Sequence, residues 1–540
     1  MSDTHECLSF IDAFFLYLEQ PGAPLNVASI SAFEGLITLD QCMEYVETKL
    51  PAIPRFLQRV VPSPLGIGAP TWQFDSNFNI RNHVREITLK RGTEAEWKVA
   101  VSEVLSGNLD RNRPLWDITL FHGLKGQRTG VVVRTHHCLV DGVAGVGLLK
   151  ELLDESSIPP PKHRKKRPVE EHPRPDLGAV LLDGLMNSCF STAQALLTAH
   201  SELLRMAQQA SFPKDKQTQT ESGGENGDGP LSRVAPLGEV ARLLSELAQP
   251  TEKLPFNVLC RGPQKFEWAE IPMAEIAAVR KACGATVNDV VLTTLTAALR
   301  RYELLHIENP KRRKLRIVVP VNVRAAGEAA GTGNRITFLP VDIPVEVHDP
   351  RELLALIQKR VGFSKTAHAA ELVALAGVLM DAIPTALQSL AGRFLSQLPI
   401  SLCNSICTNV HGPSTPLYLL GHKMLSSYPY VPIGGEMGMN CAVMSYNGSL
   451  FVGFTGDAPA IPDLGRLGKL FSESFAELRD AVVVPEAKSK QPRRKAAAKK
   501  KVAVKKTAAV RETVAVRKTE EEPASRAATE PSQETASAVA

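Results

Sequence analysis

Two adjacent histidines, an aspartate and a glycine lie within the seven-residue run 136–142 (HHCLVDG). A neutral imidazole titrates at about pH 6.5, so either His136 or His137 could take a proton from a hydroxyl at neutral pH. Glycine at position 142 would let a substrate pass close to the backbone. The plain alternative is a pair of core histidines followed by an Asp-Gly turn. Because a fixed pattern of this kind seldom arises by chance, it favours acid–base chemistry.

This run stands where a predicted strand gives way to a predicted helix. Residues 129–135 (TGVVVRT) are rich in β-branched side chains, which is typical of a buried strand. Residues 143–153 carry apolar side chains at helical spacing. The junction of a strand and a helix is a common place for chemistry in an α/β protein. We therefore expect these two elements to position the histidines.

The run fits the HHxxxDG signature of the CoA-dependent acyltransferase superfamily, which includes chloramphenicol acetyltransferase and the nonribosomal condensation domains. Further blocks resemble one branch of it, the bacterial wax ester synthase/diacylglycerol acyltransferases. The resemblance covers about residues 8–478 and is poor between 159 and 250. Asn26 stands where the family more often has histidine, and His411 where it often has proline, which bears on substrate preference. The blocks, in the family's order, are 8–15 (LSFIDAFF), Glu19, 24–27 (PLNV), 113–116 (RPLW), 286–292 (TVNDVVL), 320–324 (PVNVR), 333–335 (GNR), 409–413 (NVHGP) and 445–448 (SYNG).

The resemblance implies a direct transfer in which a fatty acyl-CoA and an alcohol enter a channel from opposite sides. His137 would remove the hydroxyl proton as the oxygen attacks the thioester, and would return it to the CoA thiolate, with His136 supporting its geometry. Such a base contributes roughly 10²–10⁴ in rate. The oxyanion needs a donor, worth roughly 3–4 kcal/mol, and Asn288 is the candidate, although its motif could equally cap a helix. A thioester is already activated, so we expect no metal and no cofactor besides acyl-CoA as co-substrate.

Other residues of the blocks are expected to have structural or lining roles. In the family the motif's aspartate forms a structural ion pair with an arginine, which the resemblance carries to Asp141, with Arg324 as the candidate partner. Gly142 and Asp289 belong to the same structural group. For Glu19, as for Asp12, a position on a helix surface is an equal alternative to a place in the site. The substrate-channel residues that the resemblance implies are Pro114, Leu115, Trp116 and Glu19.

The resemblance also implies the fold class, an α/β fold of two chloramphenicol-acetyltransferase-like subdomains with mixed sheets flanked by helices and a channel between them. We expect an N-terminal subdomain with the histidine motif over 1–157 and a C-terminal subdomain over 254–485. Residues 158–253 are expected to be a linker with a helical segment and flexible stretches. Residues 486–540 are expected to be a disordered Lys/Ala-rich tail.

The composition agrees with a large enzyme of the cytoplasm. The chain has 540 residues, of which 44% are hydrophobic, enough for a sizeable core. Its nine cysteines are scattered without a CxxC pair, which favours neither zinc nor disulfides. Cys138 could be proposed as a thiol nucleophile, but we prefer a small buried side chain, since a histidine base suffices.

Contact with a membrane is expected to be peripheral. The N-terminus lacks the features of a secretory signal, and no stretch approaches 18 uninterrupted apolar residues. Residues 177–206 and 372–398 are apolar on one face, so they could lie at the inner membrane face or on a lipid inclusion. Ordinary packing helices are the alternative.

The C-terminal tail is strongly basic and then acidic. Residues 488–518 carry 13 Lys or Arg and one Glu, in a chain whose net charge is +5. A segment of this composition can bind anionic lipid or nucleic acid by non-specific electrostatics, and a solubilising tail is an equal alternative.

The sequence therefore predicts an acyl-CoA-dependent O-acyltransferase that esterifies a long-chain alcohol, a diacylglycerol or both, giving wax ester or triacylglycerol. Three alternatives stay open. They are another HHxxxDG enzyme of the condensation or small-molecule type, a non-catalytic lipid-granule binding protein, and a nucleic-acid-associated protein that acts through its tail.

Overall fold

The structure of the protein is a computed structural model that describes residues 6–63, 69–158, 251–307, 314–322, 336–366 and 403–483. Contacts divide the chain into Met1–Val484 and Pro485–Ala540. The second unit lies outside the described residues, as do the predicted amphipathic segments 177–206 and 372–398. All described helices and strands belong to the first unit.

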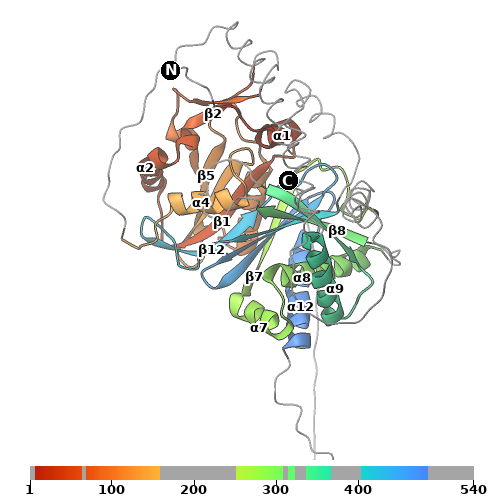
Figure 1. Ribbon diagram of the computed structural model, residues 1–540. Coiled ribbons are helices and arrows are strands. Elements are labelled where there is room, and N and C mark those ends of the chain that lie inside the picture. The colour runs from red at the N-terminus through yellow and green to blue at the C-terminus, as the bar shows by residue number, and fades with distance from the viewer. Residues whose placement is uncertain are drawn as a thin grey trace, which may run out of the picture. The chain divides into compact units, whose positions relative to one another are not determined.

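A six-stranded mixed sheet forms the first half of this unit, with β1, β5 and β12 among its strands (Figure 1). Its strand order is β11-β12-β1-β6-β5-β4. Strand β1 pairs antiparallel with β6 on one side and with β12 on the other. The elements of the first half are α1 (Phe10–Leu18), β1 (Asn26–Glu34), α2 (Leu39–Lys49), η1 (Leu50–Ala52), η2 (Pro54–Leu57), β2 (Gln58–Val61), β3 (Thr71–Phe74), η4 (Ile80–Asn82), β4 (Val84–Thr88), α3 (Glu94–Ser106), β5 (Trp116–Leu124), β6 (Arg128–His136) and α4 (Gly142–Leu152).

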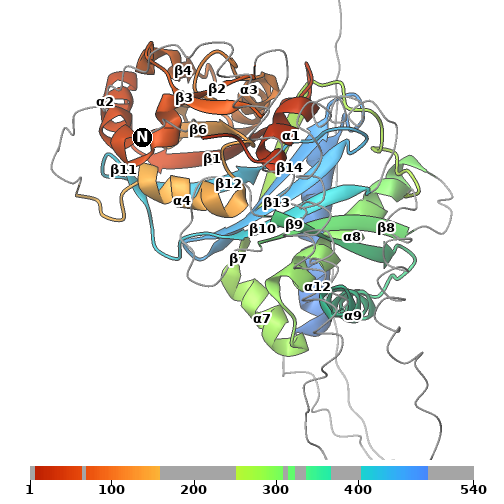
Figure 2. The same ribbon diagram turned by 45° about the horizontal axis from the view of Figure 1, so that its top comes forward.

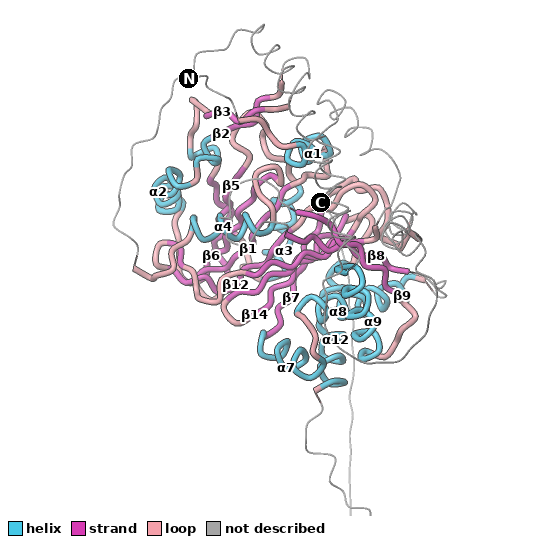
Figure 3. The backbone as a smooth tube through the Cα atoms, in the orientation of Figure 1, coloured by secondary structure: helices cyan, strands magenta, loops and turns pink. Residues whose placement is uncertain are grey.

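A second six-stranded mixed sheet, in the order β7-β14-β13-β10-β8-β9, forms the other half. Helices α8, α9 and α12 pack against one another beside it and enclose a second apolar core (Figure 3). The elements are β7 (Gln264–Pro272), α7 (Met273–Cys283), α8 (Val287–His306), β8 (Lys314–Asn322), β9 (Ile336–Pro344), α9 (Pro350–Thr366), β10 (Ser405–His411), β11 (Tyr418–Leu419), β12 (His422–Tyr430), β13 (Met439–Tyr446), β14 (Ser449–Asp457) and α12 (Leu464–Val482).

Strand β12 joins the two halves. Its sequence belongs to the second half, yet it pairs with β1 of the first sheet over Ala28–Tyr430 to Phe33–Met424. Its side chains enter the first apolar core, where Met424, Tyr428 and Tyr430 are buried. Strands β11 and β12, which follow β10 in the sequence, therefore belong to the first sheet, and Figure 2 shows β12 beside β1.

The expected α/β architecture with two mixed sheets and flanking helices is confirmed. The predicted strand 129–135 is β6, and the predicted helix 143–153 is α4. Helix α4 begins at Gly142 because the Asp141 side chain accepts a hydrogen bond from the backbone N–H of Ala144, at 2.8 Å.

One further property of the described helices bears on membrane contact. Within the described residues, no single helix has the length and apolar character needed to cross a membrane. Helices α7 and α8, which meet at a bend of 100°, pass that criterion only as a pair, by length and composition.

Candidate active site

Helix α1 brings two side chains, four residues apart, against the two histidines. The ring of Phe15 stacks on His137, with centroids 4.0 Å apart and planes 7° from parallel. One turn later, Oε1 of Glu19 lies 3.4 Å from Nε2 of His136. Phe15 lies within α1, and Glu19 is the residue that caps its C-terminus. The end of this helix therefore contacts both members of the histidine pair.

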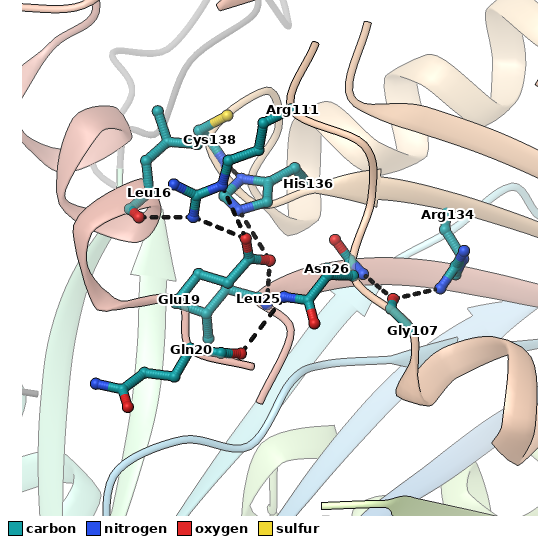
Figure 4. Close-up of polar contacts among 11 residues, drawn as sticks. Leu16, Glu19, Gln20, Leu25, Asn26, Gly107, Arg111, Arg134, His136 and Cys138 are labelled. Atoms are coloured by element: carbon teal, nitrogen blue, oxygen red, sulfur yellow. Dashed lines mark hydrogen bonds and ion pairs between the residues drawn. The ribbon is translucent and has the colours of Figure 1, made fainter. Parts of the chain in front are cut away.

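His136 is completely buried, and its contacts define which ring nitrogen carries the hydrogen (Figure 4). Its Nδ1 accepts a hydrogen bond from the backbone N–H of Cys138, at 3.1 Å. The ring hydrogen therefore sits on Nε2, which faces the Glu19 carboxylate. Both backbone groups of His136 are also used, since its N–H donates to Leu115 and its carbonyl accepts from Leu139.

Glu19 is held as a carboxylate by three donors around it. Burial by itself raises the pKa of Glu19, but the contacts with His136 and Arg111 and the charge of Arg111 outweigh burial and lower it to about 2. Arg111 donates from Nη2 to Oε2 of Glu19, at 2.7 Å, and the backbone N–H of Leu25 donates to Oε1, at 3.2 Å. Glu19 is therefore a carboxylate at neutral pH. The helix-surface interpretation of Glu19 is wrong, because its side chain is only 4% exposed.

His137 faces a cavity of about 190 Å³ between the two sheets. Its backbone N–H donates to Leu25, at 2.8 Å, which continues the pairing of β1 with β6, and the ring is held by stacking on Phe15. Side chains from α4, β1, β6, β8, β10, β12 and β13 line the cavity, and most of them are apolar. A half-buried imidazole at the edge of an apolar cavity is well placed to act as a base on a bound hydroxyl.

Asp141 and Gly142 give the cavity one of its walls. Asp141 is fully buried and caps α4, which makes it a structural residue at the helix N-terminus. Gly142 lies against β10 so closely that an added Cβ would come within 2.8 Å of Val410 Cγ2. Arg324, the predicted partner of Asp141, lies outside the described residues, so this ion pair stays a prediction.

Asn288 and Asp289 have different roles at the N-terminus of α8. Asp289 accepts from the backbone N–H of Thr286, at 2.8 Å, and completes a capping box in which Thr286 is the N-cap residue. Asp289 therefore has a structural role at the start of α8. Asn288 instead accepts a hydrogen bond through Oδ1 from Nδ2 of Asn409, and Asn409 lines the cavity beside His137. Any hydrogen bond that Asn288 donates to a substrate would therefore come from its Nδ2 group.

The segment 114–116 packs away from this cavity. Leu115 and Trp116 are buried in the first core, and neither they nor Pro114 and Glu19 line the cavity that contains His137. The indole N–H of Trp116 donates to the carbonyl of Phe56, at 2.8 Å, and its ring stacks on Phe56. The expected channel-wall role is corrected here to a packing role, because the Trp116 ring stacks on Phe56 and His83 inside the first core.

Three other residues singled out from the sequence lie off the cavity. Cys138 is buried, as predicted, and burial raises the pKa of its thiol well above the ordinary value. Asn26 is fully buried, and its Nδ2 donates to the carbonyl of Gly107, at 3.3 Å, which also accepts from Arg134 (Figure 4). His411 is exposed, and its Nδ1 lies 3.2 Å from Ser445 Oγ.

Several site residues were missed from the sequence. Arg111 has no spacing that links it to Glu19, since 92 residues separate them. Phe15 and Glu19 are four residues apart, so their position on the same side of the chain could have been predicted. Their contact with His137 and His136 could not. Gly145 and Leu149 of α4 line the cavity and follow the histidine run at helical spacing, which was a usable signal.

Comparison with known proteins identifies the family of the chain. The family model "Wax ester synthase/diacylglycerol acyltransferase catalytic domain" matches residues 8–291, and the model "WS/DGAT C-terminal domain" matches residues 332–479. A putative diacylglycerol O-acyltransferase of Mycobacterium bovis is 26% identical over 479 residues, covering 87% of this chain and 95% of the relative.

Two solved structures share the fold. The wax ester synthase/diacylglycerol acyltransferase from Marinobacter aquaeolei VT8 superposes with a TM-score of 0.57 at 22% identity, covering 88% of this chain and 99% of that one. The starter condensation domain of rhizomide synthetase, in a complex with C8-CoA and Leu-SNAC, has a TM-score of 0.50 at 13% identity, covering 89% and 95%. The catalytic-domain match spans more than half of the chain, so the protein belongs to the wax ester synthase/diacylglycerol acyltransferase family and is an acyltransferase.

Proposed function

We propose that the protein transfers a fatty acyl group from acyl-CoA to the hydroxyl of a long-chain alcohol or a diacylglycerol, with His137 as general base. The observation that carries the proposal is the position of the His137 ring at the edge of a largely apolar cavity between the two sheets. Acyl-CoA as donor is supported by the starter condensation domain of the same fold, whose structure holds C8-CoA. Diacylglycerol as acceptor is supported by the name of the mycobacterial relative.

In the proposed reaction the hydroxyl oxygen forms a bond to the thioester carbonyl carbon while His137 takes the hydroxyl proton. The carbon–sulfur bond then breaks, and the proton passes from His137 to the CoA thiolate. Proton transfer by a positioned base is worth roughly 10²–10⁴ in rate. The reaction needs no resident cofactor, because the acyl-CoA is consumed as a co-substrate.

Stabilisation of the oxyanion is assigned to Asn288, with Asn409 holding it. The amide of Asn409 donates to Oδ1 of Asn288, which leaves Nδ2 as the donor group of Asn288. Asn409 lines the cavity and Asn288 lies behind it. A donor of this kind is worth roughly 3–4 kcal/mol in the transition state. Replacing Asn409 by Leu would remove the support and leave Asn288 in place, so a smaller loss of kcat is expected than for Asn288→Ala.

His136 and Glu19 act on the base through the backbone. Glu19 fixes the hydrogen of His136 on Nε2, so Nδ1 can accept from the N–H of Cys138, directly after His137. This contact sets the turn in which His137 stands. Glu19, Arg111 and His136 are positioning residues, whereas His137 would touch the substrate.

The experiment that tests the function is the release of CoA from palmitoyl-CoA by the purified protein, offered hexadecanol and, separately, a diacylglycerol. Ester product that appears with CoA release supports the proposal and ranks the two acceptors. CoA release without an ester, or no release with either acceptor, contradicts it. Binding of lipid without turnover would then favour the lipid-granule alternative.

A further inference from the structure

Side chains on one face of the first sheet form a row that begins at His137. Alternate residues of β6 share this face, so Thr135, Val133 and Val131 follow His137 along it. The paired positions on β1 are Val27, Ser29 and Ser31, opposite those three in the same order. Strands rise about 3.3 Å per residue, so the row spans roughly 20 Å.

Two cavities lie along this row. The first contains His137 and is lined at its β1 side by Val27 and Ser29. The second, of about 30 Å³, lies further along and reaches Ser31 and Phe33 on β1 and Val131 on β6. Both cavities are bounded by the same three side chains, Val133, Leu149 and Leu152. These three residues form the partition between the cavities.

The polar groups beside the row are satisfied by one another. Ser29 Oγ lies 3.0 Å from Ser31 Oγ and 2.9 Å from Ser427 Oγ, and Ser31 donates to Ser427 at 3.2 Å. Hydroxyls that are paired in this way place little demand on a ligand for hydrogen bonds. The remaining lining of the second cavity is apolar except for Cys42, so the space suits a hydrocarbon chain and not a headgroup.

Gly145 leaves the first cavity open in its middle. It lies on the face of α4 that lines the cavity, one turn before Leu149. A Cβ added at this glycine would meet no atom within 4 Å. The space beside Gly145 is therefore open, and a larger side chain there would take up part of the cavity.

We propose that the alkyl chain of one substrate lies along β1 beneath α4, and that Gly145, Leu149 and Leu152 set the longest chain accepted. The reacting end of the substrate lies at His137 and the far end meets the partition, with the second cavity as space beyond it. This inference rests on the proposed function of the same site. The alkyl chain could be that of the acyl-CoA or that of the alcohol, which share the same chemistry.

Two variants of α4 test the inference in opposite directions. Gly145→Leu should move the optimum of kcat/KM toward shorter chains, and Leu149→Ala, which joins the cavities, should move it toward longer ones. Each methylene of the substrate chain that the variant cavity can newly bury, or can no longer bury, is expected to change kcat/KM by about fourfold. Matched controls are Gly362→Leu on α9, where an added Cβ also meets no atom within 4 Å, and Leu105→Ala on α3, another fully buried leucine. Both controls should keep the wild-type optimum.

The chain length is varied in two series, acyl-CoAs with one alcohol and alcohols with one acyl-CoA. A shift in the first series assigns the row to the acyl chain, and a shift in the second assigns it to the alcohol. An unchanged optimum in both series, with folded Gly145→Leu and Leu149→Ala proteins, overturns the inference. If Leu149→Ala does not fold, Leu149→Val takes its place.

Failure of the proposed function would look different. In that case the wild-type protein itself would transfer no acyl group. Binding can then be measured without turnover. Acyl-CoAs of increasing chain length are added, and the rise in melting temperature of the protein shows how much of each chain the cavity binds. A rise that grows with chain length in the wild type and stops growing earlier in Gly145→Leu supports the inference, and a rise independent of length overturns it.

Discussion

Glu19 is an acidic side chain with almost no contact with solvent, yet it is ionised. Its pKa of about 2, against an ordinary value of 4.5, reflects burial outweighed by the contacts with His136 and Arg111 and by the charge of Arg111. A group whose pKa is lower in the folded protein contributes stability above its unfolded pKa and loses it as the pH falls. The stabilisation from Glu19 is therefore complete above pH 4.5 and disappears as the pH falls toward 2.

Glu19→Gln should lower the free energy of unfolding by less than about 3 kcal/mol at pH 7, since solvent screens the exposed side of Arg111. The difference from the wild type should narrow as the pH falls below 4.5. Unfolding by denaturant at a series of pH values measures both effects. Glu473→Gln, an exposed carboxylate on α12, is the control and should leave stability unchanged at every pH. A Glu19→Gln difference that does not vary with pH would contradict this explanation.

At the scale of elements, α4 depends on its N-cap. Asp141 accepts from the backbone of Ala144, and loss of an N-cap costs about 0.5–2 kcal/mol. Asp141→Ala should therefore lower stability by at least that amount, and by more if the ion pair predicted with Arg324 is present. Asp141→Asn retains a capping oxygen and should be the more stable of the two variants by about 1 kcal/mol. Thermal unfolding of both proteins checks the order, and equal loss would mean that capping is unimportant here.

The packing of α4 on β10 gives a second prediction at this scale. Gly142→Ala would place a Cβ within 2.8 Å of Val410 Cγ2, and overpacking of this kind costs about 1–3 kcal/mol. Val410→Ala in the same chain removes the clashing methyl groups, so the double variant should regain stability relative to Gly142→Ala. Additive losses in the double-mutant cycle would show that the two residues do not compete for this space.

At the scale of the whole molecule, the two halves of the first unit do not have separate cores. Strand β12 completes the first sheet, and Leu417, Leu419 and Met424 belong to its apolar core. A fragment of residues 1–157 would leave one edge of β1 unpaired and would lack these side chains. We expect this fragment to show no cooperative thermal transition, whereas residues 1–484 should show one. A cooperative transition in the short fragment would contradict this dependence on β12.

The sequence predicted individual elements better than their assembly. Residues 129–135 and 143–153 have periodicities that local physics imposes on a strand and a helix, and both are found as β6 and α4. The pairing of β12 with β1 has no such local signal, because it depends on contacts between residues about 400 positions apart. The prediction of two subdomains that follow one another along the chain therefore did not place β12, from the second half of the sequence, in the first sheet.

The candidate site was predictable where the chemistry is local. The histidine run places its chemistry in one turn, so His137 could be singled out before the fold was known. The link from Glu19 to Arg111 and the contact of Asn409 with Asn288 depend on tertiary structure. Trp116 shows the opposite error, because a family motif without a periodic pattern did not reveal that its ring packs in the core.

The central claim is that His137 is the base of the transfer reaction. The most direct test is kcat for CoA release by His137→Ala, compared with the wild type and with Phe15→Leu, which removes the stacked ring but keeps the imidazole. We predict a fall of roughly 10²–10⁴ for His137→Ala at an unchanged melting temperature. Phe15→Leu should lose about tenfold at most, because a ring contact is worth about 0.5–1.5 kcal/mol. Turnover that survives in a folded His137→Ala protein would contradict the claim.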